Sequence, residues 1–498
     1  MTVQTEAVDL FSFDNSYARL PDQFFSRVSP TPVAAPHLIR LNEDLAYRLG
    51  FEPAQFTTPQ ALAVFAGNYV PETGEPLAMA YAGHQFGNFS PQLGDGRAIL
   101  LGEVIDREGV RYDIQLKGSG PTPFSRRGDG RAALGPILRE YLVSEAMATL
   151  GIPTTRALAA VTTGESVMRE SVLPGAVLTR VASSHIRVGT FQFFAARRDK
   201  EAVKALADYA IARHYPDAAG ASNPYRALLD LVITSQARLV AQWLHVGFIH
   251  GVMNTDNMTI SGETIDYGPC AFMDSYHPDT VYSSIDEGGR YAYGNQLRMG
   301  HWNLARLAET LIPLLDSDND AALKVAQSAI DKFIPQHEVA YRAGLGRKLG
   351  LRQTQPEDLS LGQDLLALMA TDSLDFTQTF RTLSEALVNP GDEAELRGRF
   401  SDLNAFDAWV ARWRRRLNDE TGDGDNIRAL MVRTNPIFIP RNHLVEEAIS
   451  AAVNEGDFLP FETLLSVLSK PFEDQPVFSR YADPPTSDQV VRQTFCGT

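Results

Sequence analysis

The chain has 498 residues, with 45 Lys and Arg against 61 Asp and Glu, which gives a formal net charge of −16 at pH 7. Its 44% hydrophobic and 21% charged residues are ordinary for a globular protein, and its length predicts two or three packed units rather than one core. The acidic balance argues against general binding to nucleic acids or anionic membranes, and two cysteines exclude a disulfide framework and a multi-cysteine zinc site.

Residues 1–75 are predicted to form an N-terminal extension with short helices. Leu38, Leu41, Leu45 and Leu49 have the three- and four-residue spacing of one helix face. The first residues lack the basic region and the apolar stretch of a secretion signal, and no segment has the ~18–20 apolar residues of a membrane span. We therefore expect a cytoplasmic protein that does not enter a membrane.

Residues 76–185 are predicted to form a lobe rich in strands. Two β-type runs, 98–104 and 110–116, flank a turn at 106–109, and this pattern indicates a β-hairpin. The second run leads directly to Lys117, so the lysine is expected at a strand end.

A helix is predicted after the loop rich in Gly, Pro and Arg that follows this lysine. Pro136 suits its first turn and Gly151 its end. The helix carries Glu140, which we expect to pair with Lys117. Glu145 on the same helix is an alternative partner.

Residues 186–310 are predicted to form a second lobe, and residues 311–498 a helical region with a tail. A long buried helix is expected over 223–246 from its apolar spacing. The loop 250–257 follows this helix, and a D-x-G turn begins at Asp266.

The order of these features is that of a protein kinase: a strand Lys, a helix Glu, an H-x6-N loop and a D-x-G turn. Lys117 would neutralise phosphate, and Asn257 and Asp266 would offer the oxygen ligands that Mg²⁺ prefers. Each feature alone has an ordinary alternative, such as an edge lysine or an Asx turn. The sequence has no Walker A motif and no G-x-G-x-x-G after a strand, which argues against P-loop and Rossmann folds.

Two departures argue against ordinary phosphoryl transfer. A kinase catalytic loop has its Asp base two residues after the His, where this chain has Val252, and the nearest carboxylate is Asp256. The chain between the strand Lys and Asp266 also holds more arginines than a kinase needs for its phosphates. They are Arg126, Arg127, Arg131, Arg180 and Arg187, each of which has a surface role as its alternative.

Four segments, 81–98, 115–147, 250–274 and 434–449, resemble the selenoprotein O family, also called YdiU or SelO. The resemblance implies an α+β, bilobal protein-kinase-like fold with an N-terminal extension and a mostly helical C-terminal region. It also implies a protein adenylyltransferase that binds ATP in a flipped orientation. Such an enzyme transfers AMP to Ser, Thr or Tyr hydroxyls of acceptor proteins and releases pyrophosphate. Transfer of UMP from UTP is a further option in the family.

The resemblance also implies roles for individual residues. Asp256 would be the proton acceptor, Asn257 and Asp266 would hold Mg²⁺ (or Mn²⁺), and Glu140 would support Lys117. The implied nucleotide-binding residues are Gly94, Gly96, Arg97, Lys117, Asp129, Gly130, Arg180, Arg187 and Asp266.

Two alternatives to adenylyl transfer stay open at this point: a kinase-type phosphotransferase and a nucleotide-binding pseudokinase scaffold. ATP and acceptor proteins are the expected partners, with no nucleic acid and no membrane, and a monomer is the default state. Cys270 lies just after the D-x-G turn, and Cys496 lies near the chain end, where some family members carry selenocysteine. These positions lead to the hypothesis of a reversible disulfide that straps the tail over the active site; two unconnected thiols are the alternative.

Overall fold

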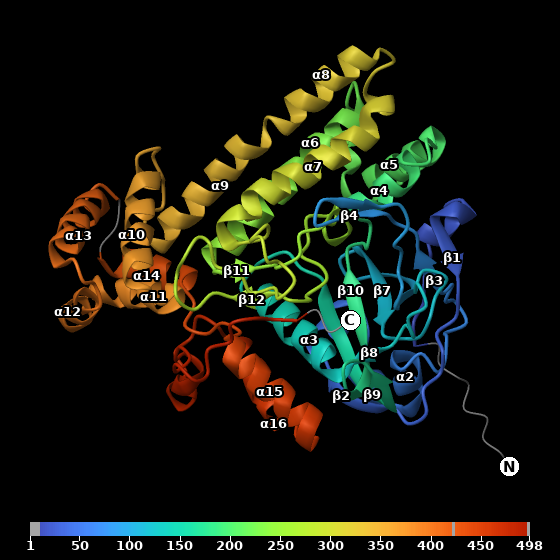
Figure 1. Cartoon of the computed structure of the whole chain (residues 1–498), viewed down its shortest axis with the longest axis horizontal. Coiled ribbons are helices and arrows are strands. Elements are labelled where there is room, and N and C mark those ends of the chain that lie inside the picture. Colours follow the sequence, from blue (N-terminus) through green and yellow to red (C-terminus); the bar gives the residue numbers. More distant parts are fainter. Residues whose placement is uncertain (1–9, 421–423, 496–498) are drawn as a thin grey trace.

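The largest element of the computed structural model, which describes residues 10–420 and 424–495, is an eight-stranded antiparallel sheet (Figure 1). Seven strands are hydrogen-bonded in the order β1, β3, β6, β7, β10, β9 and β2, and β8 pairs with β10 beside them. The strands are β1 (Phe25–Arg27), β2 (His37–Leu41), β3 (Leu77–Met79), β6 (Ala98–Ile105), β7 (Arg111–Lys117), β8 (Ala132–Ala133), β9 (Arg156–Met168) and β10 (Val172–Ala182). Two small antiparallel pairs lie outside it: β4 (Gly83–Gln85) with β5 (Asn88–Ser90), and β11 (Phe248–Ile249) with β12 (Ala271–Phe272).

The N-terminal segment supplies both edge strands of this sheet, because β1 pairs with β3 and β2 pairs with β9. The prediction of one helix face through four leucines is therefore wrong in its first half: Leu38 and Leu41 lie in β2. Helix α1 (Glu43–Arg48) begins only after Asn42, whose side chain accepts a hydrogen bond from the Leu45 N–H. Backbone pairing with β9 outweighs the local helical spacing, as a long-range sheet contact often does.

The predicted hairpin and helix of the strand-rich segment are confirmed. β6 and β7 pair antiparallel, with Ala98 opposite Lys117, and helix α3 (Leu134–Thr149) packs on β9 and β10. This helix is buried nearly all round, because α15 (Asn442–Glu455) and α16 (Leu459–Leu468) cover its other side. Side chains of α3 that face the sheet are thus shielded from water.

Helices make up most of the remaining chain, and the predicted helical character beyond residue 300 is confirmed for the described residues. The predicted long helix is α6 (Pro224–His245), and Asn223 caps it. The other helices are α2 (Pro59–Phe65), α4 (Val188–Ala195), α5 (Lys200–His214), α7 (Gln296–Leu315), α8 (Asn319–Ile330), α9 (Phe333–Lys348), α10 (Asp358–Asp372), α11 (Phe376–Ala386), α12 (Pro390–Gly398), α13 (Leu403–Leu417) and α14 (Gly424–Thr434). Within residues 10–420 and 424–495, none of these helices has both the length and the apolar character needed to cross a membrane.

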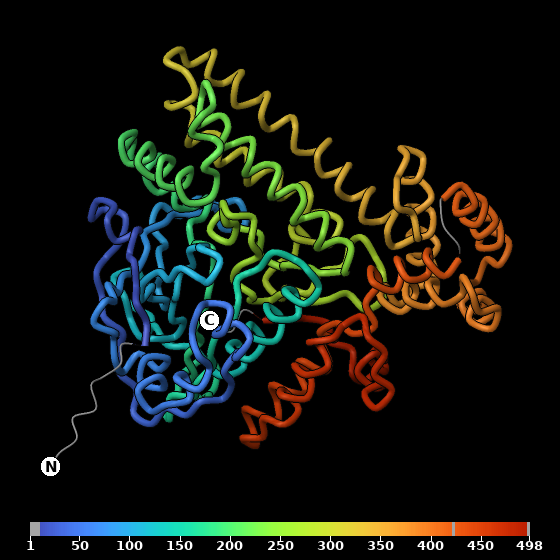
Figure 2. The backbone as a smooth tube through the Cα atoms, turned by 180° about the vertical axis from the view of Figure 1, so that it is seen from behind, coloured from blue at the N-terminus to red at the C-terminus, as the bar shows by residue number. Residues whose placement is uncertain are grey.

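The C-terminal helices leave the sheet and then return to it. Both views place α10 to α14 at the end of the molecule farthest from the sheet, whereas α15 and α16 lie against α3 (Figures 1 and 2). Arg441 stands at the point of return and is fully buried. Its Nη1 donates to Asp274 Oδ1 and to Asp375 Oδ2, both at 2.6 Å. One guanidinium therefore joins the loop after β12, the start of α11 and the start of α15.

Replacing Arg441 by Ala should destabilise the fold strongly, because two largely buried carboxylates would lose their cation. Breaking a buried ion pair on one side costs about 3–5 kcal/mol. Urea unfolding followed by circular dichroism measures this loss. Arg415→Ala is the matched control, because Arg415 is exposed on α13 and makes no ion pair within the described part of the chain. Equal unfolding midpoints for the two variants would contradict the assigned role of Arg441.

Candidate active site

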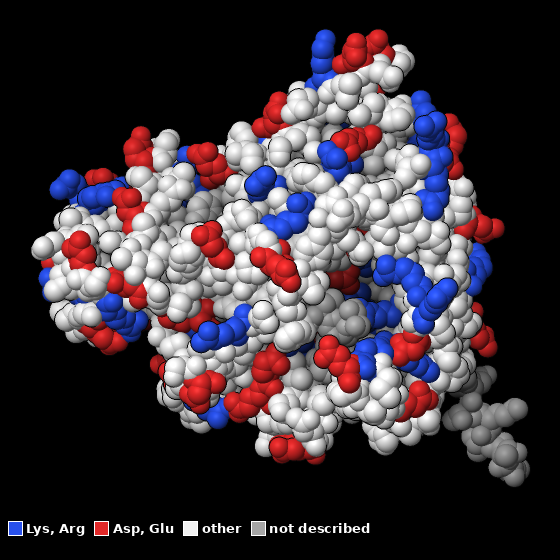
Figure 3. All heavy atoms as spheres, viewed as in Figure 1, with Lys and Arg blue, Asp and Glu red and all other residues white. Residues whose placement is uncertain are grey.

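One cavity of about 730 Å³ lies between the sheet and the loops that follow α6. A volume of this size is within the range of small-molecule and cofactor sites. The space-filling view shows a hollow on this face with Lys and Arg side chains along one side (Figure 3). The predicted catalytic, nucleotide-binding and metal residues all line the cavity: Gly94, Gly96, Arg97, Lys117, Asp129, Gly130, Arg180, Arg187, Asp256, Asn257 and Asp266.

Three cations and two carboxylates meet at the buried end of this cavity; we call Lys117, Glu140, Arg180, Arg187 and Asp266 the charge cluster. Glu140 accepts from Lys117 Nζ and from Arg180 Nε. Asp266 accepts from Arg180 Nη2 at 2.8 Å and from Arg187 Nη1. The five side chains sum to a charge of +1 (3 − 2), so the cluster favours an anion in the cavity.

Both carboxylates of the charge cluster stay ionised at neutral pH. Burial acts to raise the pKa of Asp266, but Arg187, Arg180 and Lys117 outweigh it and hold the pKa well below its usual value. Burial likewise opposes ionisation of Glu140, and Arg180 and Lys117 lower its pKa. Glu145, the alternative partner from the sequence, instead binds Arg156 and the Ala157 N–H.

The glycine turn and the following loop form the open side of the cavity. Gly94 has a φ of +72°, a conformation that favours glycine, and the neighbouring Arg97 makes no ion pair within the described residues. Asp129 is already engaged, because Arg169 donates to both of its carboxylate oxygens at 2.8 and 3.1 Å. Gly130, with a φ of +64°, lies so close to Gly120 that a side chain there would overlap the backbone. Arg97 and Arg126, which also lines the cavity, therefore make no ion pair on this side within the described residues.

Asp256 lies in a short 3₁₀ turn, Thr255–Asn257, and is only 7% exposed. Its Oδ1 is buried and has no hydrogen-bond partner within the described residues, and Gln85 Nε2 donates to Oδ2 at 3.4 Å. Burial raises the pKa of Asp256 to about 6, against a backbone hydrogen bond and the charge of Arg187, which lower it. A carboxylate with a pKa near neutrality and a vacant oxygen suits a proton acceptor. Val252 also lines the cavity, and its side chain has no group for this task.

The β4–β5 hairpin lies directly against this loop. The His84 N–H donates to Thr255 Oγ1 at 2.7 Å, and the Phe86 N–H donates to Asn254 Oδ1 at 3.1 Å. Gly83 is required for the close approach, because a Cβ there would overlap the Asp256 carboxylate. Sequence reasoning missed the contact of Gln85 with Asp256, although segment 81–98 was singled out for its resemblance.

Asp95 was missed as well. It is 2% exposed, accepts from the Met79 N–H at 3.1 Å and lies 4.0 Å from Arg187 Nη2. The Arg187 guanidinium also stacks on the Tyr81 ring at 4.7 Å from its centroid. The only signal in the sequence was the position of Asp95 between the two glycines of the turn. These contacts, together with those of Asp266, fix the direction of the Arg187 side chain.

The residues proposed for a divalent cation have the right donor chemistry. The Asn257 amide Nδ2 donates to the Val252 carbonyl at 2.9 Å, which leaves the amide oxygen as its ligand atom. Asp266 has a φ of +60°, a strained conformation for a non-glycine residue that turns its carboxylate toward the cluster. The described residues contain no group of three or more His, Cys, Asp or Glu side chains suited to a metal. Asn257 and Asp266 therefore fit a cation that takes its other ligands from phosphate and water, as Mg²⁺ commonly does.

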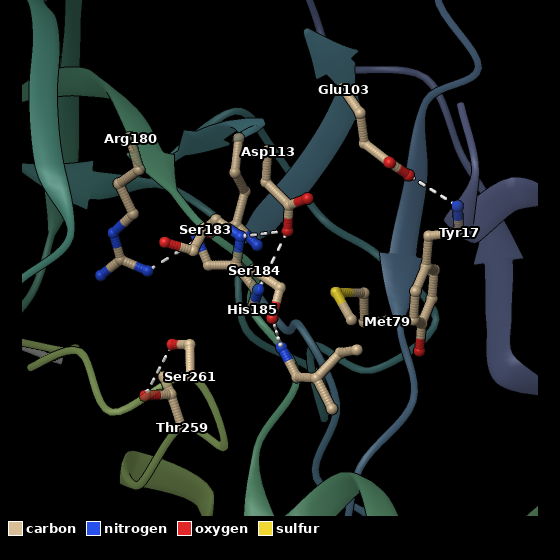
Figure 4. Close-up of polar contacts among 12 residues, drawn as sticks. Tyr17, Met79, Glu103, Asp113, Arg180, Ser183, Ser184, His185, Thr259 and Ser261 are labelled. Atoms are coloured by element: carbon tan, nitrogen blue, oxygen red, sulfur yellow. Dashed lines mark hydrogen bonds and ion pairs between the residues drawn. The ribbon is translucent and has the colours of Figure 1, made fainter. Parts of the chain in front are cut away.

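A buried polar network fixes the chain between Arg180 and Arg187 (Figure 4). Asp113 on β7 accepts from the His185 N–H at 2.9 Å and lies 2.8 Å from its Nδ1. Glu263 accepts from the N–H and the hydroxyl of Ser183, at 3.0 and 2.6 Å. The network thus joins the strand that ends in Lys117 to the loop that precedes Asp266, with both arginines between them.

The tail lies next to Cys270. Thr494 Oγ1 donates to the Pro269 carbonyl at 2.6 Å, and the Thr494 N–H donates to the Tyr282 carbonyl at 2.7 Å. Cys270 is buried with a free thiol, and burial raises its pKa to about 12. The predicted partner, Cys496, lies outside the described residues. The described part of the tail therefore reaches the loop that holds Cys270.

Comparisons with known proteins agree with one another. The family model described as "Protein adenylyltransferase SelO" matches residues 8–469. A protein nucleotidyltransferase YdiU from Methylorubrum extorquens (strain PA1) is 65% identical over 495 residues, which cover 98% of this chain and 99% of that protein. Proteins of the same name from Rhodopseudomonas palustris (strain HaA2) and Bradyrhizobium sp. (strain BTAi1) are 62% and 63% identical over 488 residues, with the same coverage.

Glu263→Gln should stabilise the protein increasingly as the pH rises from 5 to 8. Burial raises the pKa of Glu263 from 4.5 to about 7. Between these values the folded chain holds a proton that the unfolded chain has lost, so wild-type stability falls with rising pH, by about 1–3 kcal/mol in total. Gln keeps the neutral shape and has no such loss.

Chemical denaturation at several pH values measures this difference between the variant and the wild type. Glu338→Gln is the control, because Glu338 is exposed on α9. Parallel pH curves for wild type and Glu263→Gln would show that Glu263 does not titrate in this window.

Proposed function

The chain belongs to the protein adenylyltransferase SelO family and is a nucleotidyltransferase, and from this premise we propose that it transfers AMP from ATP to Ser, Thr or Tyr hydroxyls of acceptor proteins. We further propose a protein-kinase-like arrangement of two lobes. In it, residues 76–185 supply the glycine turn, Lys117 and Glu140, and residues 186–310 supply Asp256 and the metal-binding side chains. The sheet and the helices after it are compatible with this division.

The observation that carries the proposal is the placement of the charge cluster and Asp256 on one cavity. Three buried cations at one end suit the β- and γ-phosphates, which leave as pyrophosphate when the α-phosphorus is attacked. Asp256 has a raised pKa and an unpartnered oxygen, whereas Val252 stands where a kinase has its base. This combination supports adenylyl transfer better than γ-phosphoryl transfer.

The chain's own residues divide the work of the proposed reaction. Lys117, Arg180 and Arg187 would bind the pyrophosphate end and stabilise its growing charge. Asp256 would accept the proton of the acceptor hydroxyl on its carboxylate. A Mg²⁺ held by Asn257 and Asp266 would neutralise phosphate charge. Glu140 keeps Lys117 and Arg180 in place and need not touch the nucleotide.

Incubation with ATP labelled at the α- or the γ-phosphate tests the reaction. We expect protein-bound label from the α position only, and a rate at least ~100-fold lower for Asp256→Asn, because general-base catalysis is worth about that much. The dissociation constant of ATP should change only a few-fold. Asp279→Asn is the control, because Asp279 is an exposed carboxylate that does not line the cavity.

Transfer of the γ-label alone would make the protein a phosphotransferase. ATP binding with transfer of neither label would make it a pseudokinase scaffold.

We also propose that Cys270 and Cys496 form a reversible disulfide that limits access to the site. The docking of Thr494 on the carbonyl next to Cys270 supports this idea. An oxidant such as diamide would take two electrons and two protons from the two thiols.

Diamide should therefore lower transfer by the wild type, with the free-thiol count falling from two to zero, and dithiothreitol should restore both. Oxidation should be slow, because a thiol with a raised pKa carries little thiolate. Cys496→Ser is expected to keep its activity in diamide. Equal inhibition of the wild type and this variant would refute the disulfide.

A further inference from the structure

A surface patch of rings and guanidinium groups adjoins the β4–β5 hairpin; we call His84, Phe89, Arg290, Trp302 and Arg306 the Trp302 patch. The Arg290 and Arg306 guanidinium carbons each lie 5.0 Å from the Trp302 ring centroid. The His84 ring lies 5.1 Å from Trp302 and 4.9 Å from Phe89. Phe89 is 41% exposed, and Trp302 is partly exposed. An external chain therefore has both apolar and cationic surface to contact here.

Rigid contacts join this patch to the loop of Asp256. The same hairpin carries Gln85, which contacts the Asp256 carboxylate, and Phe86, whose ring lies 5.1 Å from that of Tyr291. The Tyr291 hydroxyl donates to Asn254 Oδ1 at 2.7 Å. A short series of contacts thus connects Arg290 and Phe89 to the loop of the candidate proton acceptor.

The positive charge of Arg290 is not paired with a carboxylate of the described residues. The residue is partly exposed, although its Nε is buried. The nearby carboxylate of Asp286 is used by the backbone N–H groups of Arg290 and Tyr291, at 2.9 and 2.7 Å. Arg306, in contrast, pairs with Glu309 at 2.5 Å. Arg290 is therefore the cation of the patch that an incoming carboxylate would meet.

The direction of attack places an acceptor chain on this side of the cavity. The attacking and leaving oxygens of a phosphoryl group lie roughly in line, so an acceptor hydroxyl approaches opposite the charge cluster. Gln85, Phe86 and the exposed Ile285 line the cavity at the hairpin side. Residues that flank the hydroxyl must then lie over the hairpin and the loop of Arg290.

We propose that the Trp302 patch binds the acceptor protein through a segment that carries an Asp or Glu close to the modified hydroxyl. Arg290 pairs with this carboxylate, and Trp302 and Phe89 cover apolar parts of the segment. The proposal rests on the proposed adenylyl transfer and adds its acceptor class. Acidic and basic side chains are interspersed over the face drawn in Figure 3, so selection depends on this local arginine rather than on a broad field.

Two short synthetic peptides without Trp, each with one Tyr flanked by either Glu or Lys, test the proposal. Binding is followed without nucleotide by tryptophan fluorescence, because Trp243, Trp409 and Trp413 are at most 3% exposed and Trp302 is the accessible reporter. The Glu peptide should bind at least about fivefold more tightly than the Lys peptide, the scale of one surface ion pair. Trp302→Phe should remove the signal.

Variants identify the arginine. Arg290→Ala should weaken binding of the Glu peptide about fivefold, and Arg290→Glu should reverse the preference. Arg415→Ala, an exposed arginine on the distant helix α13, should match the wild type. Equal affinity of wild type for both peptides, or an unchanged preference in Arg290→Glu, would overturn the proposal.

The binding and transfer assays separate this proposal from the adenylyl transfer itself. Transfer of α-label to both peptides at equal rates would refute the acceptor class and leave the reaction standing. Charge-selective binding without any transfer would refute the reaction and keep the binding surface. A dimer in solution that Arg290→Glu dissociates would assign the patch to a second copy of the chain and overturn the proposal.

Discussion

The gathering of five charged side chains at one point, four of them buried and Asp266 partly exposed, is the constraint on which the rest of the structure depends. Each member of the charge cluster would be costly alone, since a buried charge without a partner destabilises a fold by several kcal/mol. The members come from β7, α3, β10, the chain after β10 and the turn that begins at Asp266, so those five segments must be held in register together. The sheet, the cover of α15 and α16 over α3, and the network around Asp113 all meet this requirement.

The same constraint explains how the C-terminal helical region is connected to the sheet and to α3. Helices α10 to α14 share an apolar core with α9, β11, β12 and the loop after β12, and they contribute no residue to the cavity lining. Arg441 nevertheless connects them to the loop after β12, and α15 and α16 seal the outer side of α3. Helices α15 and α16 thus keep water from the helix that carries Glu140. Their contribution to the site is the low dielectric around its ion pairs.

Local sequence patterns correctly predicted those helices and strands that are determined by their own residues. The β6–β7 hairpin, α3 and α6 have clear periods and end signals, and the motif order brought Lys117, Asp256 and Asp266 to one site. Where long-range contacts decide, prediction from the sequence failed or stayed open. The strand at Leu38 depends on β9, the choice of Glu140 over Glu145 depends on which side of α3 faces Lys117, and the contacts of Gln85, Asp95 and Arg441 join segments far apart in the chain.

The double engagement of Asp266 has a thermodynamic consequence for ligand binding. Both of its oxygens accept from arginines, so a cation at this carboxylate would compete with those arginines until they turn to another anion. A polyphosphate is such an anion. By binding the arginines it would free the Asp266 carboxylate for the cation that accompanies the polyphosphate. Linkage would then make the coupling mutual: nucleotide would raise the affinity for the cation, and the cation would raise the affinity for nucleotide by the same factor. We therefore expect the site to take up the nucleotide and the cation as a pair.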